Sequence, residues 1–439
     1  MDPKIDMPVT LETLAPTGQA RGRYGGKLVF AWGGLPGEEV SVRTIRKQRR
    51  SLNCIVTQVH RPSASRIPPR ESHYLCCSPW QIMAEEEESA CKERMVRELF
   101  GRQCAIALPG FDVVSGAFFG YRNKLEFSFA DSPAGLSLAF FERGSHRRKL
   151  PLEGCLLGSP AINDAGRSLC SVLQAAGLGA TQLKSLVLRS NRAGQVAASL
   201  YVTEALDRLR EPLPVPPPIA ALRVFFSDPR TPAAVGTSLL CAQGNPILEE
   251  LVLGRRFRFS DRSFFQVNIP VFERALLDIR EFVPAGPVYD LYAGVGTIGI
   301  TVGAGNVVFV ESEEETAAFL RDNCLLNNLP DPVILALPAE KAFTALPPDA
   351  TVILDPPRAG IHPRVLRRVA ESRPRRIIYL SCNPATQGQD LAALLERYRL
   401  AFFRAYNFFP RTPHLETLAV LDRTANAPRR DPIRERASP

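Results

Sequence analysis

Apolar and polar residues alternate in several short segments in the middle of the chain, which is the pattern of half-buried β-strands. The clearest case is YRNKLEFSFA, where Leu125, Phe127 and Phe129 alternate with polar neighbours. Similar runs cover residues 136–144, 183–190 and 194–202, with a helical pattern around 161–176 between them. This part of the chain is therefore predicted to be a mostly antiparallel α+β unit.

The first sixty residues are glycine-rich and basic, and they also favour strands. The apolar run GKLVFAW (Gly26–Trp32) is followed by the turn GGLPGEE and by VSVRTIRKQRRSLNCIVTQVH. This pattern predicts a small β-barrel with a basic rim, the format of OB-type nucleic-acid modules, although a solvated charged hairpin fits these residues equally well. Residues 63–81 are interpreted as an irregular linker, and the acidic run at 85–88 opens a helix expected over Glu85–Phe100.

The pattern changes from about Gly286, where short buried strands alternate with helices of about ten residues. The order is PVYDLYAGVGTIGI, VVFVE, TAAFLRDNCLLNN, ATVILDPPRAG, HPRVLRRVAES and RRIIYLSCNP. Such alternation predicts a parallel, doubly wound, Rossmann-like α/β sheet. We therefore expect a barrel over residues 1–62, a linker and central domain over 63–255, an α/β domain over 256–424 and a disordered tail over 425–439, with the helix near 84–105 packed on the α/β domain.

Charge and composition narrow the function classes only slightly. The 54 Lys and Arg residues exceed the 45 Asp and Glu residues, which suits a polyanionic partner but also an ordinary basic enzyme. The chain has no 18-residue apolar run and no signal-peptide layout, so we expect a cytoplasmic protein without membrane contact. Its ten cysteines lack regular spacing, which favours reduced thiols. The five histidines form no HxxxH or HxH pair, which argues against a histidine-based metal site.

The segment DLYAGVGTIG carries a candidate cofactor loop. Gly294, Gly296 and Gly299 have GxGxxG spacing directly after a predicted strand and before a predicted helix. Glu311 ends the next strand, where a carboxylate can accept hydrogen bonds from both ribose hydroxyls. A nicotinamide dinucleotide and S-adenosylmethionine both fit this loop. Asp290, just before the loop, favours the second cofactor, which has a cationic sulfonium and no pyrophosphate.

The stretch RRIIYLSCNPAT places Cys382 where a buried strand gives way to Asn-Pro. Ligands bind at such strand ends in open α/β sheets, although a free cysteine is more often inert packing. Asp355 in LDPPRAG ends a neighbouring strand, and Glu416 in HLETLAVL opens another. A thiol and a carboxylate in one crevice suggest a nucleophile and a base. Glu416 considered alone is better explained as a surface strand residue.

Seven sequence blocks resemble the RNA uridine-5 methyltransferase family, in order and from about residue 10 to residue 422. The blocks are GKLVF…LPGEEV, YRNK, SFFQVN, DLYAGVGTIG, LDPPRAG, YLSCNPAT and HLETLAVL. The resemblance implies a class I methyltransferase domain with an N-terminal TRAM barrel. It implies that Cys382 is the nucleophile and Glu416 the base. It also implies a cofactor and uracil pocket formed by Gln266, Tyr292, Gly294, Gly296, Thr297, Glu311 and Asp355.

The activity that this resemblance implies is S-adenosylmethionine-dependent methylation of carbon 5 of a uridine in structured RNA. That carbon is a poor nucleophile until a thiolate adds to carbon 6 of the ring, and a general base must later remove the carbon-5 proton. The target base has to leave its helix or loop to reach the pocket. The TRAM barrel favours 23S ribosomal RNA, with transfer RNA as the alternative substrate, and we expect a monomer.

One departure from the family concerns an iron–sulfur site. Many members carry CxxxxxCGGC in the linker plus one later cysteine, whereas this linker is ESHYLCCSPWQ, with Ser72 and Ser78 near cysteine positions. Cys76, Cys77 and Cys155 remain, and Cys91 is a nearby spare. Three cysteines without the spacing make a four-thiolate [4Fe–4S] cluster doubtful, so no metal is assigned.

Three competing functions use parts of the same pattern. A cytosine-5 RNA methyltransferase also needs a thiolate, but the blocks are those of uridine enzymes. A nicotinamide oxidoreductase explains the glycine loop and leaves Cys382 and the basic barrel without a role. A non-catalytic RNA-binding factor keeps the barrel and tolerates loss of Cys382 and Glu416.

Overall fold

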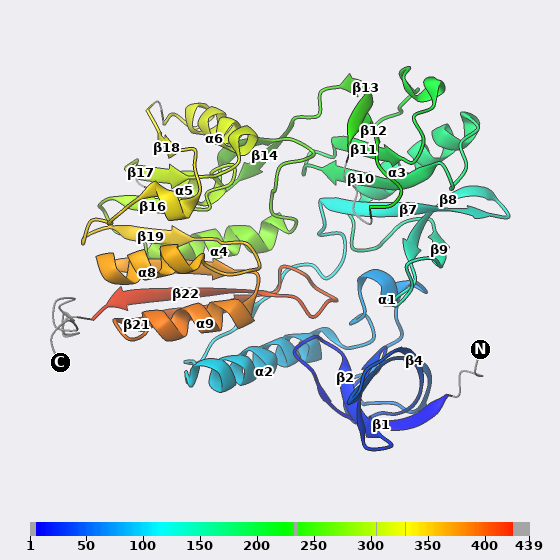
Figure 1. Ribbon diagram of the computed structural model, residues 1–439, viewed down its shortest axis with the longest axis horizontal. Coiled ribbons are helices and arrows are strands. Elements are labelled where there is room, and N and C mark those ends of the chain that lie inside the picture. The colour runs from blue at the N-terminus through cyan, green and yellow to red at the C-terminus, as the bar shows by residue number, and fades with distance from the viewer. Residues whose placement is uncertain (1–5, 232–235, 304, 330, 425–439) are drawn as a thin grey trace, which may run out of the picture.

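The computed structural model describes residues 6–231, 236–303, 305–329 and 331–424. These residues form a closed barrel, a seven-stranded sheet, a two-stranded hairpin and an eight-stranded sheet (Figure 1). The predicted fold class, a Rossmann-like α/β domain with an N-terminal β-barrel and a central α+β region, is confirmed by this arrangement. Residues 425–439, expected to be a disordered tail, lie outside the described residues.

The barrel closes in the order β1-β2-β3-β5-β4. Its strands are β1 (Met7–Leu14), β2 (Ala20–Tyr24), β3 (Lys27–Trp32), β4 (Glu39–Lys47) and β5 (Ser51–Arg61). Alternate residues point inward, so small and branched side chains such as Val29, Ala31 and Val42 fill the narrow interior. The four cationic residues Arg46, Lys47, Arg49 and Arg50 are exposed at the turn between β4 and β5.

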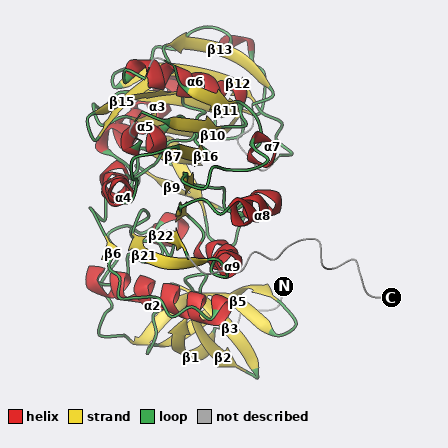
Figure 2. Ribbon diagram, turned by 90° about the vertical axis from the view of Figure 1, so that its left-hand side faces the viewer, coloured by secondary structure: helices red, strands yellow, loops and turns green. Residues whose placement is uncertain are grey.

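The linker is less irregular than expected. It contains the single-turn helix α1 (Tyr74–Cys77), and the following helix α2 spans Glu85–Cys104, slightly beyond its predicted end. In both views α2 lies between the barrel and helix α9 (Pro384–Leu394) (Figures 1 and 2). Val96 and Phe100 of α2 belong to the same buried cluster as residues of the eight-stranded sheet.

The central sheet has the order β13-β12-β11-β10-β7-β8-β9, with helix α3 (Pro160–Ala175) against β8 and β10. Its strands are β7 (Lys124–Ser132), β8 (Gly135–Phe141), β9 (Lys149–Leu152), β10 (Leu183–Ser190), β11 (Val196–Val202), β12 (Ile219–Phe226) and β13 (Ser238–Gly244), and the 3-10 turn η1 (Asp207–Leu209) follows β11. The sheet is mostly antiparallel, as predicted, although β11 and β12 pair in parallel. The hairpin of β14 (Leu248–Val252) and β15 (Arg255–Phe259) spans the predicted domain boundary at residue 255.

The eight-stranded sheet has the order β18-β17-β16-β19-β20-β22-β21-β6. Its strands are β6 (Val113–Val114), β16 (Val288–Leu291), β17 (Val307–Val310), β18 (Val333–Leu335), β19 (Thr351–Leu354), β20 (Arg376–Ser381), β21 (Tyr398–Tyr406) and β22 (Glu416–Arg423). Strands β16 to β20 are parallel, and β22 runs antiparallel to both β20 and β21.

Helices cover both faces of this sheet. One buried cluster contains residues of α4 (Ile269–Glu281), α5 (Thr297–Val302) and α6 (Glu314–Leu326). A second cluster contains residues of α2, α7 (Ala339–Ala342), α8 (Pro363–Ser372) and α9. The strands are therefore apolar on both sides, which explains their nearly continuous hydrophobic runs.

None of the helices in the described part of the chain combines the length and the apolar character needed to cross a bilayer.

Candidate active site

The carboxyl ends of three parallel strands meet at one edge of the eight-stranded sheet. Leu291 at the end of β16 pairs with Val310 on one side and with Leu354 on the other. The residues that follow these strands, Tyr292, Glu311 and Asp355, therefore leave the sheet at the same edge. This is the position where open α/β sheets bind ligands.

The glycine loop follows β16 directly. Gly294 and Gly296 have φ angles of 56° and 89°, a left-handed conformation that glycine adopts without steric cost. The backbone N–H of Gly294 donates to Glu311 Oε2 at 2.9 Å, so the carboxylate at the next strand end braces the loop. A Cβ at Gly296 would lie 2.4 Å from Leu320, whereas one at Gly294 would meet nothing within 4 Å. The open side of the loop is thus at Gly294, and the partly buried Thr297 begins α5.

Asp290 supports this loop from below. Its Oδ2 accepts the backbone N–H of Gly299 at 2.8 Å, and a Cβ at Gly299 would lie 2.7 Å from the same oxygen. Burial raises the pKa of Asp290 to about 7, and the negative charges of Asp355 and Glu311 add to this rise. Three carboxyl groups consequently surround the loop, which suits a cationic ligand and disfavours a pyrophosphate.

Cys382 and Glu416 lie side by side at the end of the β20–β22 pair. The antiparallel register ends with Ser381 opposite Thr417, so Cys382 and Glu416 occupy the next opposed positions. Cys382 is partly exposed, whereas Glu416 is only 3% exposed and its Oε2 has no hydrogen-bond partner in the described residues. A buried, unpaired carboxylate oxygen beside a thiol is the arrangement expected of a reactive site rather than of packing.

The electrostatics link these two residues to Asp355. Burial, together with the charges of Glu416 and Asp355, raises the pKa of Cys382 to about 11, while the charge of Arg358 opposes this rise. Burial also raises the pKa of Glu416 well above its usual range, as does the charge of Asp355. Asp355 itself is raised by burial to a pKa of about 7. The cluster is therefore rich in carboxyl groups that bind protons readily near neutrality.

The Asn-Pro pair after Cys382 starts a helix instead of a loop. Asn383 caps α9, its side chain accepting the N–H of Ala385 at 3.2 Å, and Pro384 is the first helical residue. The Asn383 side chain also donates to the carbonyl of Arg358 at 2.9 Å. The turn carrying Cys382 is thereby tied to the loop that carries Asp355.

A buried polar network holds the segment before Glu416, and no sequence motif predicts it. Lys92 of α2 donates to Glu88 at 3.0 Å and to the Asn407 side chain, and all three side chains are buried. Glu88 accepts the backbone N–H of Arg411, which has a φ of 63°. The spacing of Glu88 and Lys92, four residues apart on a helix, was the one available hint.

Gln266, a predicted pocket residue, is held by the YRNK segment. Asn123 donates its side-chain N–H to the Gln266 carbonyl at 2.9 Å and its backbone N–H to Val267 at 3.2 Å. Gln266 is buried, while the neighbouring Phe264 is 68% exposed. Tyr121 of the same segment donates to the carbonyl of Pro410 at 3.0 Å, close in sequence to Glu416. The structure gives the YRNK block a bracing role between these segments.

The three iron–sulfur candidates do not form a four-thiolate set. Cys77 and Cys155 bring their sulfurs to 3.7 Å, but Cys76 is not among the ligand atoms that surround this pair. The spare cysteine, Cys91, lies on α2, where its thiol donates to Glu87 at 3.2 Å. A [4Fe–4S] cluster held by four cysteines therefore does not fit the described residues.

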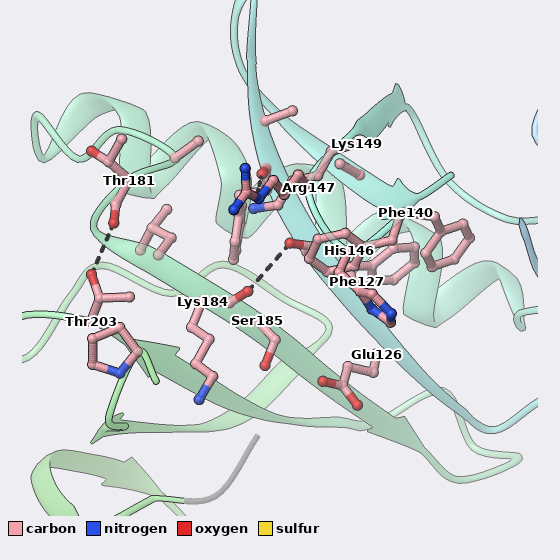
Figure 3. Close-up of a pocket in the computed structure, with 18 of the residues that line it drawn as sticks. Glu126, Phe127, Phe140, His146, Arg147, Lys149, Thr181, Lys184, Ser185 and Thr203 are labelled. Carbon is pink, nitrogen blue, oxygen red and sulfur yellow. Dashed lines mark hydrogen bonds between the residues drawn. The ribbon is translucent and has the colours of Figure 1, made fainter. Parts of the chain in front are cut away.

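A hollow of about 740 Å³ lies on the central sheet (Figure 3). Its walls include Phe127 and Phe140 together with the basic side chains of Arg147, Lys149 and Lys184. None of the predicted catalytic or cofactor residues lines it. The hollow is thus separate from the strand-end crevice.

Comparison with protein families identifies one match, described as tRNA (Uracil-5-)-methyltransferase and covering residues 348–424. The matched segment contains Asp355, Cys382 and Glu416. An uncharacterized RNA methyltransferase of Thermosynechococcus vestitus is 28% identical over 440 residues, covering 94% of this chain and 96% of its own. Another from Nitratidesulfovibrio vulgaris is 28% identical and covers 95% of this chain and 96% of its own.

Among solved structures, the fold is similar to that of the Pyrococcus abyssi tRNA (uracil-54, C5)-methyltransferase in complex with S-adenosyl-L-homocysteine. The TM-score is 0.75 at 24% sequence identity, over 94% of this chain and 100% of that one. The similarity therefore extends through the barrel, the central sheet and the eight-stranded sheet.

Proposed function

We propose that the chain is an RNA uracil-5 methyltransferase and that it methylates carbon 5 of a uridine in structured RNA through a covalent bond to Cys382. The observation that carries this proposal is the opposed placement of Cys382 and Glu416 beside Asp355. S-adenosylmethionine, when bound, supplies the methyl group and a positive charge. Glu311 and the open side of Gly294 fit its ribose and its methionine portion, and the surrounding carboxyl groups fit its charge.

Cys382 performs the first step. Its thiolate adds to carbon 6 of the uracil ring, and the ring electrons move onto carbon 5 and oxygen 4, which makes carbon 5 nucleophilic. Carbon 5 then accepts the methyl group. The high pKa of the thiol in the ligand-free protein means that a nearby positive charge, from Arg358 and from the bound cofactor, has to favour the thiolate.

Glu416 performs the second step. It removes the proton from carbon 5, and the electrons of that bond restore the ring double bond while the carbon–sulfur bond breaks. A carboxylate with a raised pKa is a stronger base than an ordinary glutamate, so the burial of Glu416 serves this step directly. Cys382 leaves as a thiolate, ready for the next cycle.

The RNA substrate is proposed as 23S ribosomal RNA, with transfer RNA as the second candidate. Exposed cationic residues at the β4–β5 turn of the barrel suit phosphate contacts, as do Arg147 and Lys149 at the hollow of the central sheet. Phe264 is exposed and lies in the same SFFQVN block as Gln266, so its ring offers a surface on which an RNA base could stack. The matched family and the structural neighbour carry transfer RNA in their descriptions, which supports the second candidate.

The experiment that tests this proposal uses methyl-labelled S-adenosylmethionine with 23S ribosomal RNA and transfer RNA lacking the modification. After nuclease digestion, the labelled nucleoside is identified by chromatography and mass spectrometry. Label in 5-methyluridine is expected, and the RNA that carries it decides between the two substrates. Label in 5-methylcytidine, or no label in either RNA, would overturn the proposal.

A further inference from the structure

Four potential metal ligands converge between the linker and the central sheet, away from the strand-end crevice. Glu71, His73 and Cys77 come from the segment around α1, and Cys155 comes from the loop that precedes α3. One ligand atom from each of the four residues lies within 4.8 Å of all the others. The two parts of the chain are far apart in sequence, so the fold assembles this group.

The spacing of the four atoms matches a single tetrahedral ion. The sulfurs of Cys77 and Cys155 are 3.7 Å apart, and His73 Nε2 lies 3.2 Å from Glu71 Oε1. Zinc bonds of about 2.3 Å to sulfur and about 2.0 Å to nitrogen or oxygen give tetrahedral edges of about 3.8 Å and about 3.3 Å. Both edges agree with the observed separations.

His73 gives a second, independent indication. The side chain is 7% exposed, and its Nε2 lies 3.2 Å from Glu71 Oε1 without the geometry of a hydrogen bond. The ring is held edge-on against Phe140 with centroids 5.6 Å apart. A buried imidazole nitrogen that faces a carboxylate and two thiols without a well-formed hydrogen bond is the arrangement expected when one ion binds all four ligands.

We propose that Glu71, His73, Cys77 and Cys155 bind one zinc-type divalent cation in a closed, structural site. Two thiolates and an imidazole select zinc over magnesium or calcium, and four protein ligands leave no open position for catalysis. The set contains two thiolates instead of the four that a [4Fe–4S] cluster requires, so the site replaces such a cluster and does not hold one. A search for paired histidines passes over His73 because its partners are a glutamate and two cysteines, one of them far away in the sequence.

Surrounding hydrogen bonds hold the ligands in place. Glu71 Oε2 accepts from Gln81 at 2.7 Å, and its Oε1 accepts the backbone N–H of Leu156 at 2.6 Å. Asn163 of α3 brackets Cys155, accepting its N–H at 2.9 Å and donating to its carbonyl at 3.1 Å. Such outer partners orient the ligands of metal sites.

The bound ion would fasten the linker to the central sheet. Arg143 of the central domain donates to the carbonyl of Leu75 in α1 and stacks over Trp32 of the barrel at 4.2 Å. The proposed metal site therefore shares the short helix α1 with a contact that joins the central domain to a barrel aromatic residue. Its role is to fix the barrel's position relative to the central sheet, independently of the methyl-transfer chemistry.

The test measures zinc, iron and acid-labile sulfide in the full-length protein purified under reducing, anaerobic conditions. About one zinc per chain is expected, with no sulfide. The variants Cys155→Ser and His73→Ala should retain less than about a tenth of this zinc, whereas Cys76→Ser, the matched neighbouring control, retains all of it. Far-ultraviolet circular dichroism establishes that each variant is folded.

A spectroscopic measurement keeps the proposal falsifiable if a variant does not fold. Wild-type protein freed of metal by a chelator is titrated with Co²⁺, and thiolate-to-cobalt absorption with tetrahedral bands is expected at about one equivalent. Absence of these bands from folded, reduced protein would overturn the proposal. Iron with stoichiometric sulfide, a Cys77–Cys155 disulfide in the anaerobic protein, or equal zinc loss in Cys76→Ser would also overturn it.

Discussion

Two thiol-bearing sites of this molecule show how surroundings decide what a cysteine does. Cys382 is partly exposed at a strand end, and burial together with the charges of Glu416 and Asp355 raises its pKa to about 11. Cys155 is buried and Cys77 is partly buried, and both have an imidazole nitrogen and a carboxylate oxygen within 4.8 Å. Cys382 thus has acidic neighbours, whereas the Cys77–Cys155 pair has companion metal ligands. We therefore propose a reactive role for Cys382 and metal binding for the pair.

The two sites also differ in the rigidity of the elements that carry their cysteines. Cys382 is positioned by the register of β20 and β22 and by the Asn383 cap of α9, which are rigid elements. The Cys77 site is built from a single-turn helix and a loop, which have little internal stability. A reactive group needs a preformed frame, whereas a structural ion can itself supply the order that its surrounding segments lack.

Replacing the reactive thiol should have the largest effect. Cys382→Ala is expected to lower methyl transfer by about 10⁴-fold or more, because no other group at the crevice can add to carbon 6. Cys241→Ala, a partly buried cysteine of β13, serves as the matched control and should retain full activity. Initial rates of methyl transfer from labelled S-adenosylmethionine to RNA measure the activity of both variants. Comparable loss in the control, or near-normal activity of Cys382→Ala, would remove the distinction between the two thiol sites.

The neighbouring carboxylate should have the next largest effect. Glu416→Gln is expected to slow turnover by about 10²- to 10⁴-fold, because a positioned general base contributes about that much. Since thiol addition precedes proton removal, this variant should accumulate protein covalently bound to RNA, which a denaturing gel detects. Slow turnover without such accumulation would assign Glu416 a role before carbon–sulfur bond formation.

The buried network of Glu88, Lys92 and Asn407, which holds the segment before Glu416, should contribute to the stability of the fold. Lys92→Met removes the nearer of the two cations beside the buried Glu88, the other being Arg411 at 3.6 Å, and also removes the donor to the Asn407 side chain; this is expected to lower the free energy of unfolding by about 3 kcal/mol. Urea denaturation of the full chain measures the change. The exposed pair of Arg97 and Glu93 on the same helix provides the comparison, because Arg97→Met should cost less than about 1 kcal/mol.

The smallest effect of a substitution is expected on the rate at which Cys382 is alkylated. The pH dependence of this rate tests how the neighbouring carboxyl groups change the pKa of the thiol. With a pKa of about 11, Cys382 is mostly protonated at neutral pH, and its alkylation by iodoacetamide should accelerate about tenfold per pH unit between pH 7 and pH 9. Glu416→Gln removes a charge that raises the pKa of Cys382, so labelling should rise several-fold at pH 9, where Glu416 is more fully ionised than at pH 7. Peptide mass spectrometry follows each cysteine, and an unchanged or slower rate at Cys382 would contradict the assigned charge effect.

The local pattern of the chain predicted much of this molecule. Alternating residues placed β7 and β10, and continuous apolar runs placed β16, β19 and β20 with their chemically important ends. The opposed positions of Cys382 and Glu416 could only be suggested, because strand pairing between β20 and β22 is not local information. The Asn-Pro pair predicts the turn that ends β20, and the strand does end just before it. The same Asn383 also caps helix α9, which the sequence pattern did not predict.

Contacts between segments that are far apart in the sequence could not be predicted from local patterns. The network of Glu88, Lys92 and Asn407 joins positions more than 300 residues apart, so no local pattern contains it. The group around His73 combines three residue types from a linker and a loop, and no spacing rule covers such a set. The short helix α1 was missed because a single turn has too few residues to show periodicity.

The most direct test of the central claim is covalent trapping at carbon 6 of the pyrimidine. The protein is incubated with S-adenosylmethionine and substrate RNA containing 5-fluorouridine, whose fluorine cannot be removed as a proton, and the adduct is mapped by peptide mass spectrometry. The account predicts one RNA-linked peptide, carrying Cys382, and no adduct in Cys382→Ala. An adduct on another cysteine, or none from an enzyme that methylates the unmodified RNA, would contradict it.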